Sequence, residues 1–152
     1  MKKIRSSKKG FTLAELLIVV AIIGVLVGIS IPIFSAQLEK SRESTDIANL
    51  RAAKAAAVAA YLDADMSNTK VSWKDANDAS KGFTAYYDAD EGSLKAAKTG
   101  ITGYGEGTGT PGNASNTQFD YAPGTAVTDK VIKVEVDGDG VCTFTWEAVT
   151  NS

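Results

Sequence analysis

Residues 11–34 read FTLAELLIVVAIIGVLVGISIPIF, and this stretch decides the fold. Sixteen of its 24 residues are large and apolar, and Glu15 is the only one that carries a charge. As a helix the stretch would be about 36 Å long at ~1.5 Å per residue, which is enough to cross a bilayer. Because such a helix is apolar on every side, it must lie in lipid or against other protein.

The ten residues before this stretch carry five basic side chains and no acidic one (Lys2, Lys3, Arg5, Lys8 and Lys9). Basic residues beside an apolar segment stay on the cytoplasmic side of a membrane. A secretory signal would have a shorter apolar core and a small-x-small cleavage site, and residues 32–35 offer no clear site. We therefore expect a transmembrane helix over 11–34 with a cytoplasmic N-terminus.

Glu15 is the informative residue of the apolar segment. An acidic side chain inside such a helix costs about 2.5 to 3.5 kcal/mol on insertion, so it usually has a partner or a function. Alternatively, Glu15 lies at the membrane edge and is hydrated. A cut between Gly10 and Phe11 would place a new α-amine four residues before Glu15. Two copies staggered along their axes could then pair this amine with the carboxylate.

Residues 9–17, KGFTLAELL, resemble the type IV prepilin signature, in which a basic leader ends in glycine before a phenylalanine and a glutamate stands fifth in the mature chain. The resemblance covers roughly the first third of the chain. It implies that a membrane prepilin peptidase cleaves after Gly10 and methylates the amine of Phe11. It also implies that Glu15 neutralises the amine of a neighbouring subunit during assembly.

The same resemblance implies an α+β fold, with a long N-terminal helix packed on a small antiparallel sheet, and a protein that polymerises rather than catalyses. The implied partners are identical or related pilin subunits, the prepilin peptidase, and the pilus assembly platform with its ATPase machinery. The subunit would span the inner membrane once before assembly and belong to an extracellular filament afterwards, serving adhesion, aggregation or twitching motility. A type II secretion pseudopilin and an uncleaved, membrane-anchored binding module are the alternatives.

Two features of the apolar segment concern helix packing. Gly24 and Gly28 stand four residues apart with Ala21 one turn earlier, so they could form a strip where helices approach closely, although chance in a Val/Ile/Gly-rich stretch explains them equally well. Pro32 has no amide hydrogen and clashes with the carbonyl of Gly28. We expect a kink or a melted turn at Pro32.

Residues 35–65 have the composition of an amphipathic continuation of this helix. A dense alanine run from Ala52 to Ala60 favours helix. The charged residues are expected to face water (Glu39, Lys40, Arg42, Glu43, Asp46, Arg51 and Lys54). A second face, interrupted by Lys54, is expected to meet a sheet (Ile47, Leu50, Val58, Tyr61 and Leu62).

The remaining residues, 66–152, should form a globular head. Residues 131–136 and 141–147 predict a C-terminal β-hairpin around a glycine-containing turn. Alternation places Ile132, Val134 and Val136 on one face of the first strand, and Cys142, Phe144 and Trp146 on one face of the second. Residues 66–98 suggest loops with room for one short strand or helix. Residues 100–113 contain six glycines and are expected to form an exposed loop.

The composition disfavours catalysis, metal binding and nucleic-acid binding. Histidine is absent, and the single cysteine cannot form an internal disulfide. The disulfide loop usual in the family is therefore missing, which suggests either a Gram-positive host or a fold closed by hydrogen bonds. Loss of the leader changes the net charge from −2 to −7 (−2 − 5 = −7), which should repel nucleic acid.

Three short motifs could indicate a functional site. Gly107, Gly109 and Gly112 have dinucleotide-loop spacing but no preceding strand or following helix. Asp137 and Asp139 favour a plain turn over a calcium site. The sequon at Asn113 is a pattern that arises often by chance. We expect no cofactor, no metal and no enzyme activity.

Overall fold

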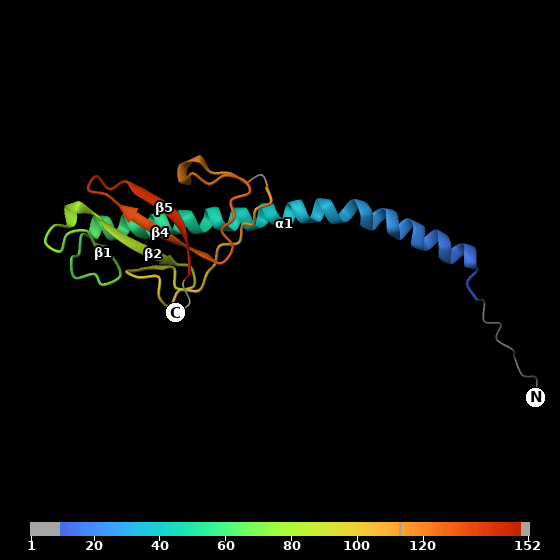
Figure 1. The fold of residues 1–152 in the computed structure, drawn as a ribbon, viewed down its shortest axis with the longest axis horizontal. Coiled ribbons are helices and arrows are strands. Elements are labelled where there is room, and N and C mark those ends of the chain that lie inside the picture. Colours follow the sequence, from blue (N-terminus) through green and yellow to red (C-terminus); the bar gives the residue numbers. More distant parts are fainter. Residues whose placement is uncertain (1–9, 113, 150–152) are drawn as a thin grey trace, which may run out of the picture. The chain divides into compact units, whose positions relative to one another are not determined.

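The computed structural model describes residues 10–112 and 114–149. Leader residues 1–9 and the sequon residue Asn113 lie outside this part. The chain forms one long helix followed by a small antiparallel sheet, which is the α+β fold expected (Figure 1). The elements are α1 (Leu13–Asp63), β1 (Ser72–Trp73), η1 (Ala79–Lys81), β2 (Phe83–Asp88), β3 (Ser93–Lys95), η2 (Thr117–Phe119), β4 (Lys130–Val136) and β5 (Cys142–Ala148).

The chain divides after Ala36 into two compact units, and helix α1 contributes to both. In the first unit, every residue from Gly10 to Ala36 is exposed. By length and composition, α1 contains a stretch that could cross a membrane. The helix is continuous through Pro32, so the melted turn does not occur in the isolated chain.

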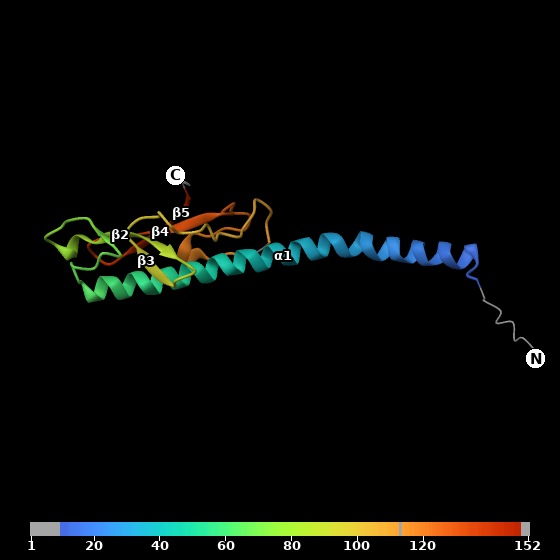
Figure 2. The same ribbon diagram turned by 90° about the horizontal axis from the view of Figure 1, so that it is seen from below.

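The second unit begins at Gln37 and contains the sheet. The strand order is β1-β2-β4-β5, with β3 paired to β2, and all pairs are antiparallel. Strands β4 and β5 form the expected hairpin, in which Val134 lies opposite Phe144. Figure 2 shows the sheet along one side of the C-terminal part of α1, and in the view of Figure 1 the two overlap.

The core lies between this part of α1 and the sheet. It contains Leu50, Ala53 and Ala57 of α1, Phe83 and Ala85 of β2, and Ile132, Val134 and Val136 of β4. Cys142, Phe144 and Trp146 of β5 are partly buried against it, on the face that alternation predicted. The core is therefore assembled from one helix face and the inward faces of three strands.

The predicted apolar stripe of α1 is only half correct. Ile47 and Leu50 are buried, but the side chains of Val58 and Leu62 are exposed, Leu62 at 76%. Ala53 and Ala57 make the sheet contact instead, because their small side chains let the helix approach closely. Tyr61 is half-buried and donates its hydroxyl to the carbonyl of Gly138 at 2.7 Å.

The prediction for residues 66–98 contained too few strands. The region holds three strands, and β2 is a central strand paired with β1, β3 and β4. Two of its side chains, Phe83 and Ala85, are fully buried. The aspartate-rich composition belongs to the connections: Asp75 and Asp78 each accept a backbone N–H two residues later, which stabilises turns. Strands β1 and β3 are only two and three residues long, too short to leave a pattern.

The prediction that residues 100–113 form an exposed loop was wrong. Ile101, Gly105, Gly107 and Gly112 are buried. A Cβ atom at Gly112 would come closer than 3.0 Å to the backbone of α1 at Lys40. The glycines therefore allow this segment to approach the helix closely, a role that composition alone does not distinguish from a flexible loop.

Candidate functional site

The residues predicted for processing lie immediately before helix α1. Gly10 and Phe11 precede the first helical residue, Leu13, and both are exposed, Phe11 at 89%. Glu15 stands in the first turn of the helix. The structure therefore gathers Gly10, Phe11 and Glu15 at one helix start, with the Gly10–Phe11 peptide bond outside the helix.

Thr12 and Glu15 form a reciprocal N-terminal cap. The backbone N–H and the hydroxyl of Thr12 both donate to Oε2 of Glu15 at 2.8 Å, and the N–H of Glu15 lies 3.2 Å from the Thr12 hydroxyl oxygen. This arrangement satisfies backbone donors that a helix start leaves free. Sequence reasoning missed the role of Thr12, although a Thr-x-x-Glu pattern before an apolar run is the known signal.

Gly24, Gly28 and Pro32 lie further along the exposed part of α1. A Cβ atom at Gly24 or Gly28 would meet no atom within 4 Å. The structure thus leaves both glycines open to a second helix but brings no partner to them. Their role in packing and the role of Pro32 in loosening the helix stay predictions.

The second unit contains a cluster of buried carboxylates that the sequence analysis placed in water. Glu39, Glu43 and Asp46 lie on one face of α1 and are 3%, 0% and 0% exposed. Glu43 accepts three backbone N–H groups, from Gly112 and Gly124 on Oε1 and from Ala114 on Oε2, at 2.8 to 2.9 Å. The prediction failed because these partners come from residues 69 to 81 positions away.

The other two carboxylates have partners in the same region. Asp46 accepts the N–H groups of Glu106 and Gly107 at 2.8 Å and the hydroxyl of Tyr121 at 2.9 Å. Glu39 accepts the N–H of Thr108 and also pairs with Arg42 at 3.3 Å. The three side chains therefore hold the glycine-rich segment against the helix.

The environments of Glu39 and Asp46 shift their pKa values in opposite directions. Burial favours the neutral form of Glu39, but the Thr108 hydrogen bond and the Arg42 charge outweigh it, so the pKa of Glu39 lies below its usual range. Burial raises the pKa of Asp46 despite its three donors. Burial, and then the bond to Asp46, raises the pKa of Tyr121.

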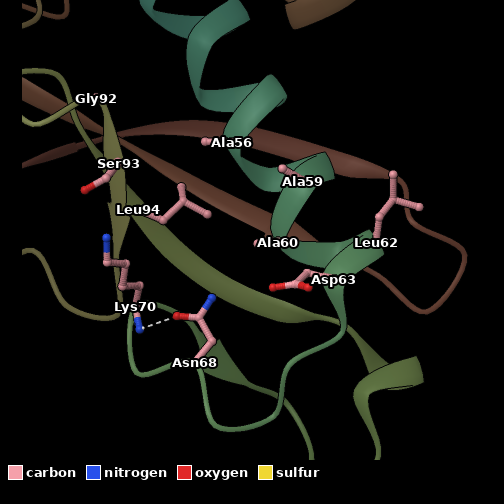
Figure 3. A pocket seen from close by; sticks show the side chains of 10 residues that line it. All are labelled: Ala56, Ala59, Ala60, Leu62, Asp63, Asn68, Lys70, Gly92, Ser93 and Leu94. Atoms are coloured by element: carbon pink, nitrogen blue, oxygen red, sulfur yellow. Dashed lines mark hydrogen bonds between the residues drawn. The ribbon is translucent and has the colours of Figure 1, made fainter.

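A groove of about 650 Å³ lies between the end of α1 and strand β3 (Figure 3). Ala56, Ala60 and Leu94 form its apolar part, and Asp63 and Lys70 lie at its edge. The side-chain oxygen of Asn68 accepts the backbone N–H of Lys70, so this amide is used within a turn. The groove does not gather a set of groups suited to catalysis.

The remaining chemical motifs have structural roles. Asp137 accepts the N–H groups of Asp139 and Val141, which closes the β4–β5 turn. Cys142 is partly buried in the core, and burial raises the pKa of its thiol. Among residues 10–112 and 114–149, no group of three or more acidic or cysteine side chains is arranged to hold a metal ion.

Comparison with known proteins concerns the N-terminal part of the chain. Residues 5–31 match a family model described as the prokaryotic N-terminal methylation motif. The matched residues include the start of the exposed apolar helix, which is similar to this motif.

Several known proteins are similar to part of this chain. The chain is 41% identical over 58 residues to fimbrial protein Q and to the type IV major alpha-pilin of Moraxella bovis, and 42% identical over 57 residues to a fimbrial protein of Pseudomonas aeruginosa. Each alignment covers 38% of this chain and 36% to 37% of the relative. No solved structure matches the chain. Over these 57 to 58 residues the chain is similar to type IV pilins and fimbrial proteins, and it spans well under half the length of each.

Proposed function

We propose that this protein is a structural subunit of a type IV pilus, and that its work is polymerisation rather than catalysis. The observation that carries the proposal is the apolar part of α1 from Leu13 to Ala36, in which the described residues leave every large apolar side chain exposed. Lipid or identical helices are the environments that would cover it. The relatives named fimbrial protein and type IV pilin support this reading.

The subunit would first be anchored in the inner membrane by residues 11–34, with the basic leader on the cytoplasmic side. Residues 35–65 and the head, 66–152, would lie outside the membrane. Prepilin peptidase would cleave after Gly10 and methylate the amine of Phe11. The exposed, non-helical peptide at this position supports the proposal, since a protease binds its substrate in extended form.

Glu15 would neutralise the new amine of a neighbouring subunit when the helices enter the filament. In the isolated chain, both hydrogen bonds from Thr12 end on Oε2. Oε1 is therefore available for a second partner while the cap stays formed. Gly24 and Gly28 would provide close helix contacts, and Pro32 would mark where the helix loosens.

Assembly would require the platform and ATPase of the pilus machinery. The filament would serve adhesion, aggregation or twitching motility through the surface of the head. These roles follow from the resemblance of the N-terminal signature, and no feature of the head is used to support them.

Mass analysis of the subunit from sheared surface filaments tests the processing steps. We expect a chain that begins with methylated Phe11. An intact leader on the exported protein would instead support an uncleaved membrane-anchored module. Calcium-dependent melting of the head would favour a pseudopilin.

A pair of variants separates the charge of Glu15 from its capping role. Glu15→Gln keeps a side-chain oxygen that can cap the helix but removes the charge. Thr12→Ala keeps the charge but removes the capping hydroxyl. If pairing with an amine drives assembly, Glu15→Gln abolishes sheared filaments while Thr12→Ala retains them, with both variants inserted in the membrane. Filament loss in Thr12→Ala alone would contradict the pairing.

A further inference from the structure

The feature that calls for explanation is how the head holds a long irregular segment in place without a disulfide. Residues 108–112 and 114–124, which we call the strap, connect the glycine-rich region to the turn before β4, and these described residues include the short helix η2. The one cysteine, Cys142, lies on β5 and is free. Another device must therefore hold the strap in place.

Hydrogen bonds from the strap converge on the buried carboxylates of α1. Glu39 accepts from Thr108, Glu43 from Gly112, Ala114 and Gly124, and Asp46 from the Tyr121 hydroxyl. Among the described residues, these are all the hydrogen bonds that join the strap to α1 or to the sheet. Its other backbone bonds are internal or reach only the adjoining turn, as between Asn116 and Tyr121.

Glu43 binds two distant positions of the strap with a single oxygen atom. Its Oε1 atom accepts from Gly112 at 2.9 Å and from Gly124 at 2.8 Å, so one oxygen joins two residues that stand 12 positions apart in the chain (124 − 112 = 12). The carboxylate is fully buried. Bonds to a buried charged acceptor are strong, because water cannot replace them.

Glycine makes this geometry possible at the contact. A Cβ atom at Gly112 would come closer than 3.0 Å to Oε2 of Glu43 and to the backbone of Glu39 and Lys40. Any larger residue would push the strap off the helix. The apolar anchor of the strap is Phe119, which packs edge-to-face on Phe144 of β5 with ring centroids 5.4 Å apart.

We propose that Glu43 is a carboxylate latch, which closes the strap as a disulfide would, and that the strap opens as one unit, separately from the sheet, when the latch is lost. The inference is independent of the proposed function, since it concerns the second unit alone. A latch made of hydrogen bonds opens and recloses without redox chemistry. The strap is therefore the part of the head surface that can be remodelled while β2, β4 and β5 stay folded.

Hydrogen exchange of the full-length chain in detergent micelles tests the latch. In Glu43→Gln, the side-chain amide nitrogen occupies one oxygen position and cannot accept, so at least one strap amide loses its partner. We expect the amides of the strap to exchange at least about tenfold faster, through an opening during which the amides of β4 stay protected. Glu135→Gln, which removes the same charge from a partly exposed sheet residue, should change neither.

The decisive amides are those of Asn116 and Tyr121, which bond each other's carbonyls and do not touch Glu43. Their acceleration would show that the strap opens as a unit. Acceleration of only the amides of Gly112, Ala114 and Gly124 would overturn the proposal, as would exchange of the strap and β4 amides through one common opening.

A second measurement covers the case in which Glu43→Gln does not fold. The wild-type chain is followed by exchange at increasing, sub-denaturing urea. We expect the strap amides to share one opening that occurs before that of β4. A single opening common to the strap and β4 would overturn the proposal.

Discussion

The two parts of helix α1 differ in which side chains they expose to water and which they bury. From Leu13 to Ala36 the helix exposes every large apolar side chain, whereas from Gln37 to Asp63 it buries three carboxylates. Both are costly for a protein alone in water. The difference lies in the partners: the carboxylates of the second part find donors within their own chain, while the apolar side chains of the first part would be covered by lipid or by other protein. Burial therefore depends on the available partner, not on polarity alone.

Matched leucine truncations should show the largest contrast between the two parts. Leu50 is 1% exposed in the core, so Leu50→Ala should lower the free energy of unfolding of the head by about 2 to 5 kcal/mol. Leu26 is 59% exposed, so Leu26→Ala should change it by less than about 0.5 kcal/mol. Denaturation of the chain in micelles, followed by Trp73 and Trp146 fluorescence, measures both. Equal losses would refute the division at Ala36.

Substitution of glutamate by glutamine in each part of α1 should give the next largest difference in the free energy of unfolding. Glu43→Gln leaves a buried donor without an acceptor and should lower the free energy of unfolding by about 2 to 3 kcal/mol. Glu15→Gln should leave it unchanged, because the hydrogen bonds of the Glu15 side chain to described residues all go to Thr12, outside the head. The same denaturation assay applies. A Glu43 variant as stable as wild type would show that the buried carboxylate contributes nothing to stability.

Tyr121→Phe should have a smaller effect. It removes one hydroxyl donor to Asp46 but leaves the backbone donors of Glu106 and Gly107 in place. We expect a loss of about 1 kcal/mol in the free energy of unfolding. Tyr86→Phe is the control, since the Tyr86 hydroxyl makes only a 3.3 Å contact with Glu147 on the sheet. An equal loss in both variants would argue against a special role for the Asp46 bond.

The smallest effect concerns the pH dependence of stability. The pKa of Glu39 is lowered in the folded state, so its stabilisation is present above its usual pKa and is lost as pH falls through the folded value. The pKa of Asp46 is raised, so the folded state gains relative stability from its protonation, and this gain is lost as pH rises through the folded value. Unfolding free energies measured across the acid range should therefore respond in opposite directions to Glu39→Gln and Asp46→Asn. If both substitutions changed the pH dependence of the unfolding free energy in the same direction, this would contradict the opposite pKa shifts of Glu39 and Asp46.

Part of this fold can be predicted from local sequence patterns. Alternation along β4 and β5 predicts the hairpin and its inward faces, because each strand has one buried side. The short strands β1 and β3 have no such pattern, since their positions depend on pairing with β2. The stripe on α1 was misjudged at Val58 and Leu62, because the sheet meets small alanines instead.

The candidate processing site was predictable for the same reason. Gly10, Phe11 and Glu15 are adjacent in the chain, and the cap between Thr12 and Glu15 spans three residues. The latch was not predictable. Glu43 on a charged helix is compatible with an exposed face, and six glycines are compatible with a mobile loop.

The sequence by itself determined the apolar helix, the helix start and the hairpin, because each depends on residues close together in the chain. Only the tertiary structure decided that three glutamate and aspartate side chains are buried. Their donors lie 60 to 81 residues away, and the energy of a carboxylate depends on whether those donors reach it.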